Sequence, residues 1–189
     1  RIAGRIGCMV ENAKDEEIYQ FLLSKSQSSK MCESIIKIKG DEESVANELQ
    51  TVDIFVGLNQ GKHLLWGEGC PRTQQEAMHC GCVLIAFDVL GNREYLYNGW
   101  TGRQGAAAVA VGVWNAIEAT LDNASEKERI RTNGENLVNA VFSEKGKFEL
   151  ISSFLDLILM VSINFIFIYI IMAQSITIHY IRYWIFVNI

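Results

Sequence analysis

Apolar and polar positions change period along residues 1–155, and these changes predict alternating strands and helices. Short apolar, often β-branched runs predict strands over residues 5–10, 34–39, 53–58 and 82–87. Apolar residues at helical spacing predict helices over residues 15–29, 41–50, 73–80, 106–121 and 125–141. The runs DIFVGL (53–58) and CVLIAF (82–87) are apolar almost throughout, as is typical of strands that a parallel sheet buries on both faces.

This alternation predicts the fold class. Strands that alternate with helices at this spacing form a parallel sheet with helices on both faces. We therefore expect an α/β, Rossmann-like domain over residues 1–155. In such sheets, ligands bind outside the carboxyl ends of the strands, close to helix N-termini. The loop after residues 53–58 and the turn after residues 82–87 are thus the expected ligand-binding segments.

Helix boundaries follow from local signals. Thr73 followed by Glu76, and Ser125 followed by Glu128, have the spacing of capping boxes, in which each side chain accepts from the other residue's backbone N–H. They predict helices that begin at about Thr73 and about Ser125. Gly81 is placed to end the first of these helices in the left-handed conformation.

Charge almost stops after Asp156. From residue 157 to 189 the only formally charged side chain is Arg182, and residues 157–173 form an apolar run interrupted only by Ser162 and Asn164. Seventeen residues are at the short limit for a helix that spans a bilayer. We therefore treat residues 156–189 as a separate apolar tail.

Three interpretations of this tail stay open. It is a terminal membrane helix, a last helix buried against the domain, or a non-native extension. The buried helix accounts only for residues 148–160. The extension is suggested by residues 161–189, which hold ten Ile but no Leu and no Gly, a composition that AT-rich DNA gives when it is read out of frame.

The composition of the whole chain excludes several classes of protein. Of its 189 residues, 49% are hydrophobic and 21% are charged, enough apolar surface to build a core. Seventeen basic against 22 acidic residues give a net charge of −5, and no cluster of Lys and Arg suits a nucleic-acid backbone. A single Pro excludes Pro-rich linkers.

The cysteines favour a reducing, cytoplasmic environment, because five in a domain this large are not typical of a disulfide framework. Cys70, His79, Cys80 and Cys82 lack the paired spacing of a zinc site, so no metal is expected. The chain begins at Arg1 without a Met or an apolar leader. From this we expect an internal piece of a longer protein or a processed chain.

Two carboxylates flank the start of the helix that follows the strand at 53–58. Glu68 lies in the loop and Glu76 in the first turn of the helix, while Gly69 allows the backbone to approach a ligand closely. Amides at a helix start attract phosphate, and carboxylates accept strong hydrogen bonds from hydroxyl groups. This combination suits a nucleotide sugar. The alternative is that Glu76 only caps the helix and Glu68 is a solvated loop carboxylate.

The order of motifs over this region is more specific. Glu68 and Glu76 are separated by seven residues, and EAMHCG (76–81), GNRE (91–94) and NGWTG (98–102) follow. This pattern resembles the donor-binding C-terminal domain of retaining glycosyltransferases with the GT-B fold. These enzymes carry Glu-x7-Glu, Glu-Ala-Met-x-x-Gly and a Gly-x-x-Glu turn that ends in Asn/Asp-Gly-x-Thr-Gly. The resemblance covers about residues 33–150 and is closest to the rhamnosyltransferase-like, surface-polysaccharide group.

The resemblance implies a role for each matching residue. Glu68 would be the catalytic residue beside the donor sugar and its anomeric centre, and Glu76 would hold the ribose hydroxyls. The backbone of the intervening residues would line the sugar and the diphosphate: Gly69, Cys70, Pro71, Arg72 and Thr73. Gly91 and Glu94 would order the donor from the turn after residues 82–87. Lys14 would offset the charge of the diphosphate.

The resemblance also implies an activity and its partners. A hexose or deoxyhexose would pass from a nucleoside-diphosphate sugar to a glycan or lipid-linked acceptor with retention, without a tightly bound cofactor or metal. A missing N-terminal GT-B domain would supply the acceptor site, so the chain alone would bind a nucleotide sugar weakly and turn over poorly. A membrane surface is a further expected partner.

The chain departs from the family pattern at three points. Pro71 comes earlier than the Gly-x-Pro of the family, Leu90 replaces a Gly, and the early loop offers only Lys14, with Arg5 as a second candidate, for the diphosphate. Two alternatives therefore stay open. One is a non-catalytic, degenerate nucleotide-binding module, with residues 157–173 as a membrane tether, and the other is a GT-B epimerase.

Overall fold

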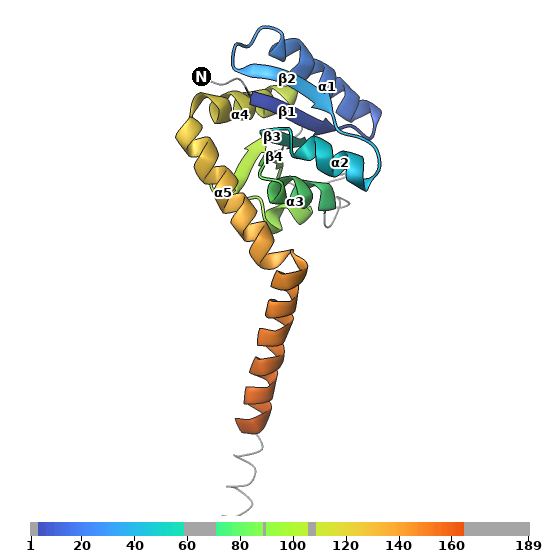
Figure 1. Cartoon of the computed structure of the whole chain (residues 1–189). Coiled ribbons are helices and arrows are strands. Elements are labelled where there is room, and N and C mark those ends of the chain that lie inside the picture. Colours follow the sequence, from blue (N-terminus) through green and yellow to red (C-terminus); the bar gives the residue numbers. More distant parts are fainter. Residues whose placement is uncertain (1–3, 59–70, 89, 106–108, 165–189) are drawn as a thin grey trace, which may run out of the picture. The chain divides into compact units, whose positions relative to one another are not determined.

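The computed structural model describes residues 4–58, 71–88, 90–105 and 109–164 (Figure 1). The chain divides into two compact units, Arg1–Ser143 and Glu144–Ile189. The first unit contains the sheet and the helices that cover it. In the second unit, residues 144–164 are helical. No helix in the described part of the chain is both long enough and apolar enough to cross a membrane.

Five parallel strands form the sheet in the order β2-β1-β3-β4-β5 (Figure 1). The strands are β1 Gly4–Met9, β2 Cys32–Lys37, β3 Ile54–Gly57, β4 Val83–Phe87 and β5 Gly102–Gly105. The helices are α1 Ala13–Ser26, α2 Glu42–Leu49, α3 Arg72–His79, α4 Ala110–Asp122 and α5 Ala124–Val141, and a short 3-10 helix, η1, spans Leu90–Glu94. The predicted α/β, Rossmann-like fold class is confirmed.

The helices cover both faces of the sheet. On one face, α1 and α4 bury side chains such as Leu22 and Ile117 against β1, β3 and β4. On the other face, α2 and α3 bury side chains such as Leu49 and Met78 against Phe55 of β3. Because β3 and β4 are covered on both sides, all of their residues are buried, which is why these strands read as continuous apolar runs.

Both predicted capping boxes are wrong, because other residues cap the helices. The N-cap of α5 is Asn123, whose Oδ1 accepts from the backbone N–H of Glu126 at 3.1 Å and from the hydroxyl of Ser125 at 2.9 Å. Asn is as good a cap as Ser, and Asn123 also terminates α4, so α5 follows α4 directly.

The start of α3 likewise lies earlier than predicted. Its N-cap is Pro71, which provides no side-chain acceptor, and Thr73 already lies inside the helix. Glu76 pairs with Arg72 at 3.6 Å, one turn earlier, instead of capping the helix. The prediction for the other end is confirmed: Gly81 has a φ of +81° and donates to the carbonyl oxygen of Met78 at 3.0 Å.

The sequence pattern did not predict β5. Its sequence, Gly-Arg-Gln-Gly, has no apolar side chain. Gly102 is required here because a Cβ would lie 2.7 Å from the carbonyl oxygen of Leu84 in β4 and 2.4 Å from Leu96 Cδ1. The backbone of β5 therefore packs where a side chain normally would.

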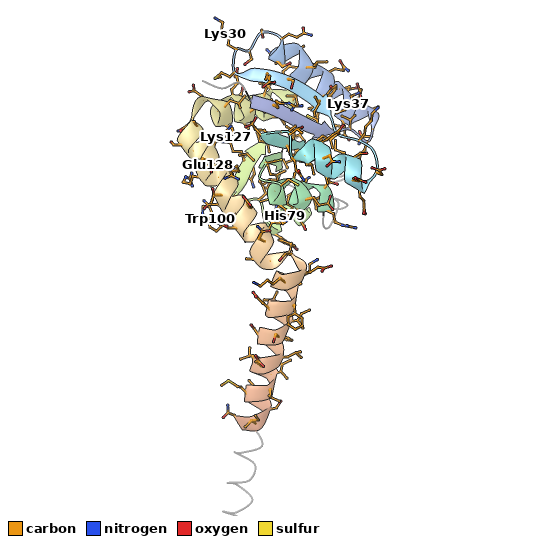
Figure 2. The ribbon with its side chains drawn as sticks, in the orientation of Figure 1. Lys30, Lys37, His79, Trp100, Lys127 and Glu128 are labelled. Carbon is orange, nitrogen blue, oxygen red and sulfur yellow. The ribbon has the colours of Figure 1, made fainter. Side chains whose placement is uncertain are left out.

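An ion pair joins the amino-terminal edge of the sheet to α5. Asp53, directly before β3, accepts from Lys127 Nζ at 2.8 Å and from the backbone N–H of Arg5 at 2.9 Å. Figure 2 labels Lys127 in the first turn of α5. Nearby, Arg103 of β5 pairs with Glu126 of α5 at 2.9 Å. These contacts fix the register of α5 against the strands.

Candidate functional site

The strand order identifies the place where a ligand is expected. From β1 the chain first adds β2 on one side and then β3 on the other, so the topology switches between β1 and β3. Ligands of open α/β sheets bind at such switch points, outside the carboxyl ends of the strands. A small pocket of about 30 Å³ lies there, between the ends of β1 and β3 and the start of α3. It is lined by Met9, Glu11, Phe55, Gly57, Pro71, Thr73 and Gln74.

The first turn of α3 forms one wall of this pocket. The first backbone N–H groups of a helix have no acceptor within the helix, so they carry partial positive charge and attract anions. In α3 the earliest intrahelical bond runs from the N–H of Gln74 to the carbonyl oxygen of Pro71 at 3.2 Å. The N–H groups of Arg72 and Thr73 precede that bond and have no acceptor within the helix.

Gly57, the last residue of β3, allows α3 to come this close. A Cβ on Gly57 would lie 2.5 Å from Nε2 and 2.7 Å from Cδ of Gln74, which is less than real Cβ atoms tolerate. The side chain of Gln74 therefore lies directly over the end of β3. Only a glycine leaves room for it.

Gln74 belongs to a group of buried polar side chains. The hydroxyl of Tyr95 lies 3.1 Å from the Gln74 carboxamide oxygen and 2.9 Å from Asn92 Oδ1, and Asn92 Nδ2 donates to the carbonyl oxygen of Phe87 at 2.8 Å. Gln74 is 2% exposed, and its Nε2 has no hydrogen-bond partner among the described residues. An unsatisfied buried polar atom is costly and calls for an explanation.

The loop after β1 supplies the acidic wall. Asn12 caps α1 by accepting from the N–H groups of Lys14 and Asp15, at 2.9 and 3.0 Å. The buried Asp15 in turn accepts from the N–H of Glu11 at 3.1 Å and from Asn12 Nδ2 at 2.8 Å. These bonds hold the backbone of Glu11 beside the pocket while its side chain stays exposed.

The structure brings some of the predicted site residues together and separates others. Pro71 and Thr73 line the pocket. Arg72 and Glu76 lie on the exposed side of α3, where the Glu76 carboxylate is about half exposed and pairs with Arg72. The catalytic candidate Glu68, together with Gly69 and Cys70, lies outside the described residues.

The remaining predicted residues come from the segments that follow β1 and β4. Lys14 is exposed in the first turn of α1. Gly91 is buried and Glu94 is exposed in η1, directly after β4. All three therefore lie at the carboxyl edge of the sheet, whereas Arg5 lies near the start of β1 beside Asp53. In η1, Arg93 pairs with Asp88 at 2.7 Å, and this carboxylate raises the pKa of Arg93.

Sequence reasoning missed five of the pocket residues: Met9, Glu11, Phe55, Gly57 and Gln74. A signal for Gln74 exists, since Gln74, Ala77 and Met78 follow the i, i+3, i+4 spacing of a buried helix face. A polar residue on such a face marks a buried hydrogen bond or a ligand contact. Gly57, near the end of the apolar run 53–58, is a second signal, because a glycine in a strand often marks the close approach of another group.

The described cysteines give no sign of nucleophilic or metal chemistry. Burial raises the pKa of Cys8 and of Cys82 to about 12, so both thiols stay protonated at neutral pH. Within the described ranges, no group of three or more His, Cys, Asp or Glu side chains could hold a metal ion.

Comparison by sequence finds no matching family model and no matching curated protein. Solved structures do match. HepE of Anabaena, in complex with UDP and glucose, superposes with a TM-score of 0.62 at 14% identity, over 82% of this chain and 48% of HepE. The C-terminal domain of the group 1 glycosyl transferase LpcC from Francisella tularensis gives a TM-score of 0.55 at 16% identity, over 76% of this chain and 89% of that domain.

A third match extends the group. Sucrose-phosphate synthase from Thermosynechococcus elongatus gives a TM-score of 0.55 at 17% identity, over 82% of this chain and 46% of the synthase. The chain thus spans about half the length of HepE and of the synthase, but most of the isolated LpcC domain. The described part of the chain has the fold of the C-terminal domain of GT-B glycosyltransferases.

Proposed function

We propose that this chain is the donor-binding half of a retaining glycosyltransferase, which transfers a hexose or deoxyhexose from a nucleoside-diphosphate sugar to a glycan or lipid-linked acceptor. The observation that carries this proposal is the pocket at the β1–β3 switch point, bounded by the first turn of α3. The similarity to HepE, which is solved with UDP-glucose, supports it.

Each part of a nucleotide sugar has a matching group at this edge of the sheet. The N–H groups at the start of α3, which have no acceptor within the helix, suit the diphosphate, whose charge they offset without a metal. Glu76 suits the ribose hydroxyls, because its carboxylate is accessible and its pair with the exposed Arg72 is weak. Glu68 is proposed as the catalytic residue beside the anomeric carbon, with Gly69 and Cys70 next to it.

A second domain completes this proposal. The chain covers 48% of HepE, and we assign the acceptor site and the facing wall of the cleft to the part that has no counterpart here. Lys14, at the start of α1, is the proposed basic partner of the diphosphate, and Gly91 and Glu94 of η1 border the donor. A cytoplasmic location beside a membrane fits a lipid-linked acceptor.

One observation favours the alternative of a non-catalytic, degenerate nucleotide-binding module. Among the described residues that line the pocket there is no Lys or Arg, and Glu11 adds a negative charge. Such a pocket binds a diphosphate less tightly than one with a basic clamp. This alternative predicts binding without transfer even when the second domain is present.

The experiment that tests the proposal is calorimetric titration of the full chain with UDP, GDP and ADP. We expect one of them to bind saturably and Glu76→Ala to weaken it at least about tenfold, because hydrogen bonds to a carboxylate contribute about 1.5–3 kcal/mol each. Glu128→Ala is the matched control: Glu128, labelled on α5 in Figure 2, also pairs with an Arg of its own helix but lies on another element.

Two results would contradict the proposal. If the folded wild-type chain binds none of the three diphosphates at millimolar concentration, it has no donor site of its own. If Glu76→Ala and Glu128→Ala have equal effects, Glu76 does not hold the ribose.

A further inference from the structure

The hydroxyl of Tyr95 lies between two buried carboxamides, and their hydrogen bonds have to be assigned together. The orientation of the Asn92 carboxamide is assigned first, because its Nδ2 donates to the Phe87 carbonyl oxygen, which can only accept. Asn92 Oδ1 therefore faces Tyr95, and the Tyr95 hydroxyl donates its single hydrogen to it at 2.9 Å. At 3.1 Å, Gln74 then faces the lone pairs of the Tyr95 oxygen. The group of Gln74 that faces Tyr95 must be a donor.

A half-turn about the Cγ–Cδ bond of Gln74 meets this requirement. It exchanges the amide nitrogen and oxygen almost without a change of shape. Nε2 then donates to Tyr95, and the hydrogen bonds run in one direction from Gln74 through Tyr95 and Asn92 to the backbone. The buried nitrogen that had no partner now has one. Oε1 takes its place above Gly57, so the unpaired group of Gln74 is an acceptor.

We infer that Gln74 determines specificity for the transferred sugar, by accepting a hydrogen bond from one of its hydroxyl groups through Oε1. This inference rests on the proposed function. Gln74 lines the pocket, and its side chain is 98% buried beside the first turn of α3. A buried oxygen without a donor is costly, so a ligand that supplies a hydroxyl here is favoured over one that does not.

The chemistry of the pocket favours a sugar hydroxyl over a phosphate oxygen or the ribose. Phosphate oxygens have no hydrogen to donate at neutral pH and are repelled by an amide oxygen. The ribose is assigned to Glu76, two residues later and about 200° around the helix, on the exposed side of α3. Gln74 points toward the sheet instead, over Gly57, so we assign a different part of the donor to it.

The test compares UDP with UDP-glucose on the full chain, by calorimetry, for the wild type, Gln74→Leu and Gln74→Glu. Leu keeps the volume but has no acceptor, so we expect it to weaken UDP-glucose about five- to tenfold and UDP less than twofold. A protonated Glu keeps an oxygen toward the pocket and donates to Tyr95 with its O–H, as the amide does. Burial favours the protonated form, so at pH 6 we expect UDP-glucose to bind within about threefold of the wild type. The melting temperature of each variant is measured alongside.

A second measurement does not depend on the variants' stability. In ¹H–¹⁵N spectra, the side-chain NH₂ of Gln74 is assigned by its absence in Gln74→Leu or Gln74→Glu. We expect the hydrogens of this NH₂ group to exchange slowly with solvent, because the group donates to Tyr95. For the same reason, its chemical shift should stay nearly unchanged when UDP-glucose is added. A large shift on addition of UDP alone would place the nitrogen toward phosphate and overturn the inference.

The binding results separate the two proposals. If Gln74→Leu weakens the binding of UDP and of UDP-glucose equally, or of neither, then Gln74 does not bind a hydroxyl group of the sugar, while the proposed function stands. If Gln74→Glu at pH 6 weakens UDP-glucose as much as Gln74→Leu does, an oxygen at this position does not accept from the sugar and the assignment is wrong. If the wild type binds neither ligand, the proposed function fails and this inference fails with it.

Discussion

Polar residues have different roles at the two ends of the parallel strands, the amino-terminal edge and the carboxyl edge of the sheet. At the amino-terminal edge, opposite charges meet: Asp53 accepts from Lys127 and from the backbone of Arg5, and Arg103 pairs with Glu126. At the carboxyl edge, Gln74 is buried with one group that has no partner among the described residues, and the pocket beside it is lined by an acidic residue, Glu11. At the first edge the charges meet opposite charges within the fold, although Arg103 Nε has no hydrogen-bond partner among the described residues. At the second edge, the polar atom without such a partner belongs to a residue that lines a pocket.

The difference separates stability from binding. The ion pairs at the amino-terminal edge tie α5 to the strands, and their charges are already balanced within the fold. At the carboxyl edge, the first N–H groups of α3 have no acceptor within the helix, and one group of Gln74 has no partner among the described residues, so a ligand can supply partners to both. Substitutions at the first edge should therefore change the free energy of unfolding alone, and substitutions at the second should change ligand affinity as well.

The largest expected effect comes from Gly57→Ala, which disturbs the carboxyl edge where α3 meets β3. The new Cβ would overlap the Gln74 side chain, and β3 cannot retreat because β1 and β4 hold it on both sides. We expect a loss of about 1–3 kcal/mol in the free energy of unfolding, measured in urea, and at least a fivefold loss of UDP-glucose affinity.

The matched control for this variant is Gly4→Ala in β1. There the new Cβ would meet Leu121 Cδ2, the end of a partly buried side chain that can turn away. We expect a smaller loss of stability and unchanged affinity. If Gly57→Ala destabilises the protein but leaves affinity unchanged, the end of β3 is not part of the site.

Burial patterns explain which elements the sequence could predict. The run VLIAF predicts β4 because a strand covered on both faces needs apolar residues at every position. Strand β5 could not be found this way, since its two glycines pack through their backbone against Leu84 and Val113. Propensity alone favours Ser125 as a cap as much as Asn123, and the start of α5 is decided by where α4 ends.

The site could be predicted by position more easily than by residue. Alternation of strands and helices places a ligand at the carboxyl edge, and Pro71 and Thr73 do line a pocket there. The helical spacing of Gln74 with Ala77 and Met78 places it on the buried face of α3, but its contact above Gly57 depends on how α3 packs on β3, which that spacing does not give. The roles of Glu68, Gly69 and Cys70 stay predictions, because these residues lie outside the described part of the chain.

At the amino-terminal edge, the expected effect of Asp53→Asn depends on pH. Burial raises the pKa of Asp53, but the hydrogen bonds from Lys127 and the backbone of Arg5 outweigh it, so the pKa lies below its ordinary value of 3.8. A lowered pKa stabilises the fold above pH 3.8, and that contribution is lost as the pH falls through the lowered value. We expect Asp53→Asn to cost about 1–2 kcal/mol at pH 7, since the pair is partly exposed, and less at low pH.

Urea unfolding of both proteins between pH 2 and pH 7 measures this difference. The difference in the free energy of unfolding between the wild type and Asp53→Asn should be largest near neutral pH and should decrease as the pH falls. The affinity for UDP at pH 7 should be unchanged in Asp53→Asn. A difference that is constant with pH would show that the charge of Asp53 does not contribute to stability. A loss of UDP affinity would show that the amino-terminal edge also affects binding.

The smallest expected effect is at Glu11, where removing a charge should help binding. Glu11 is one of the residues that line the pocket, and its exposed carboxylate repels a diphosphate there, although solvent and salt screen that repulsion. We expect Glu11→Gln to tighten UDP binding about two- to fivefold at low salt, with the gain fading at higher salt and stability changing by less than about 0.5 kcal/mol. The control is Glu33→Gln, which removes an exposed charge near the start of β2, at the opposite edge. Equal gains in UDP affinity from both variants would mean that only the net charge of the protein matters. The position of Glu11 at the carboxyl edge would then have no effect of its own on binding.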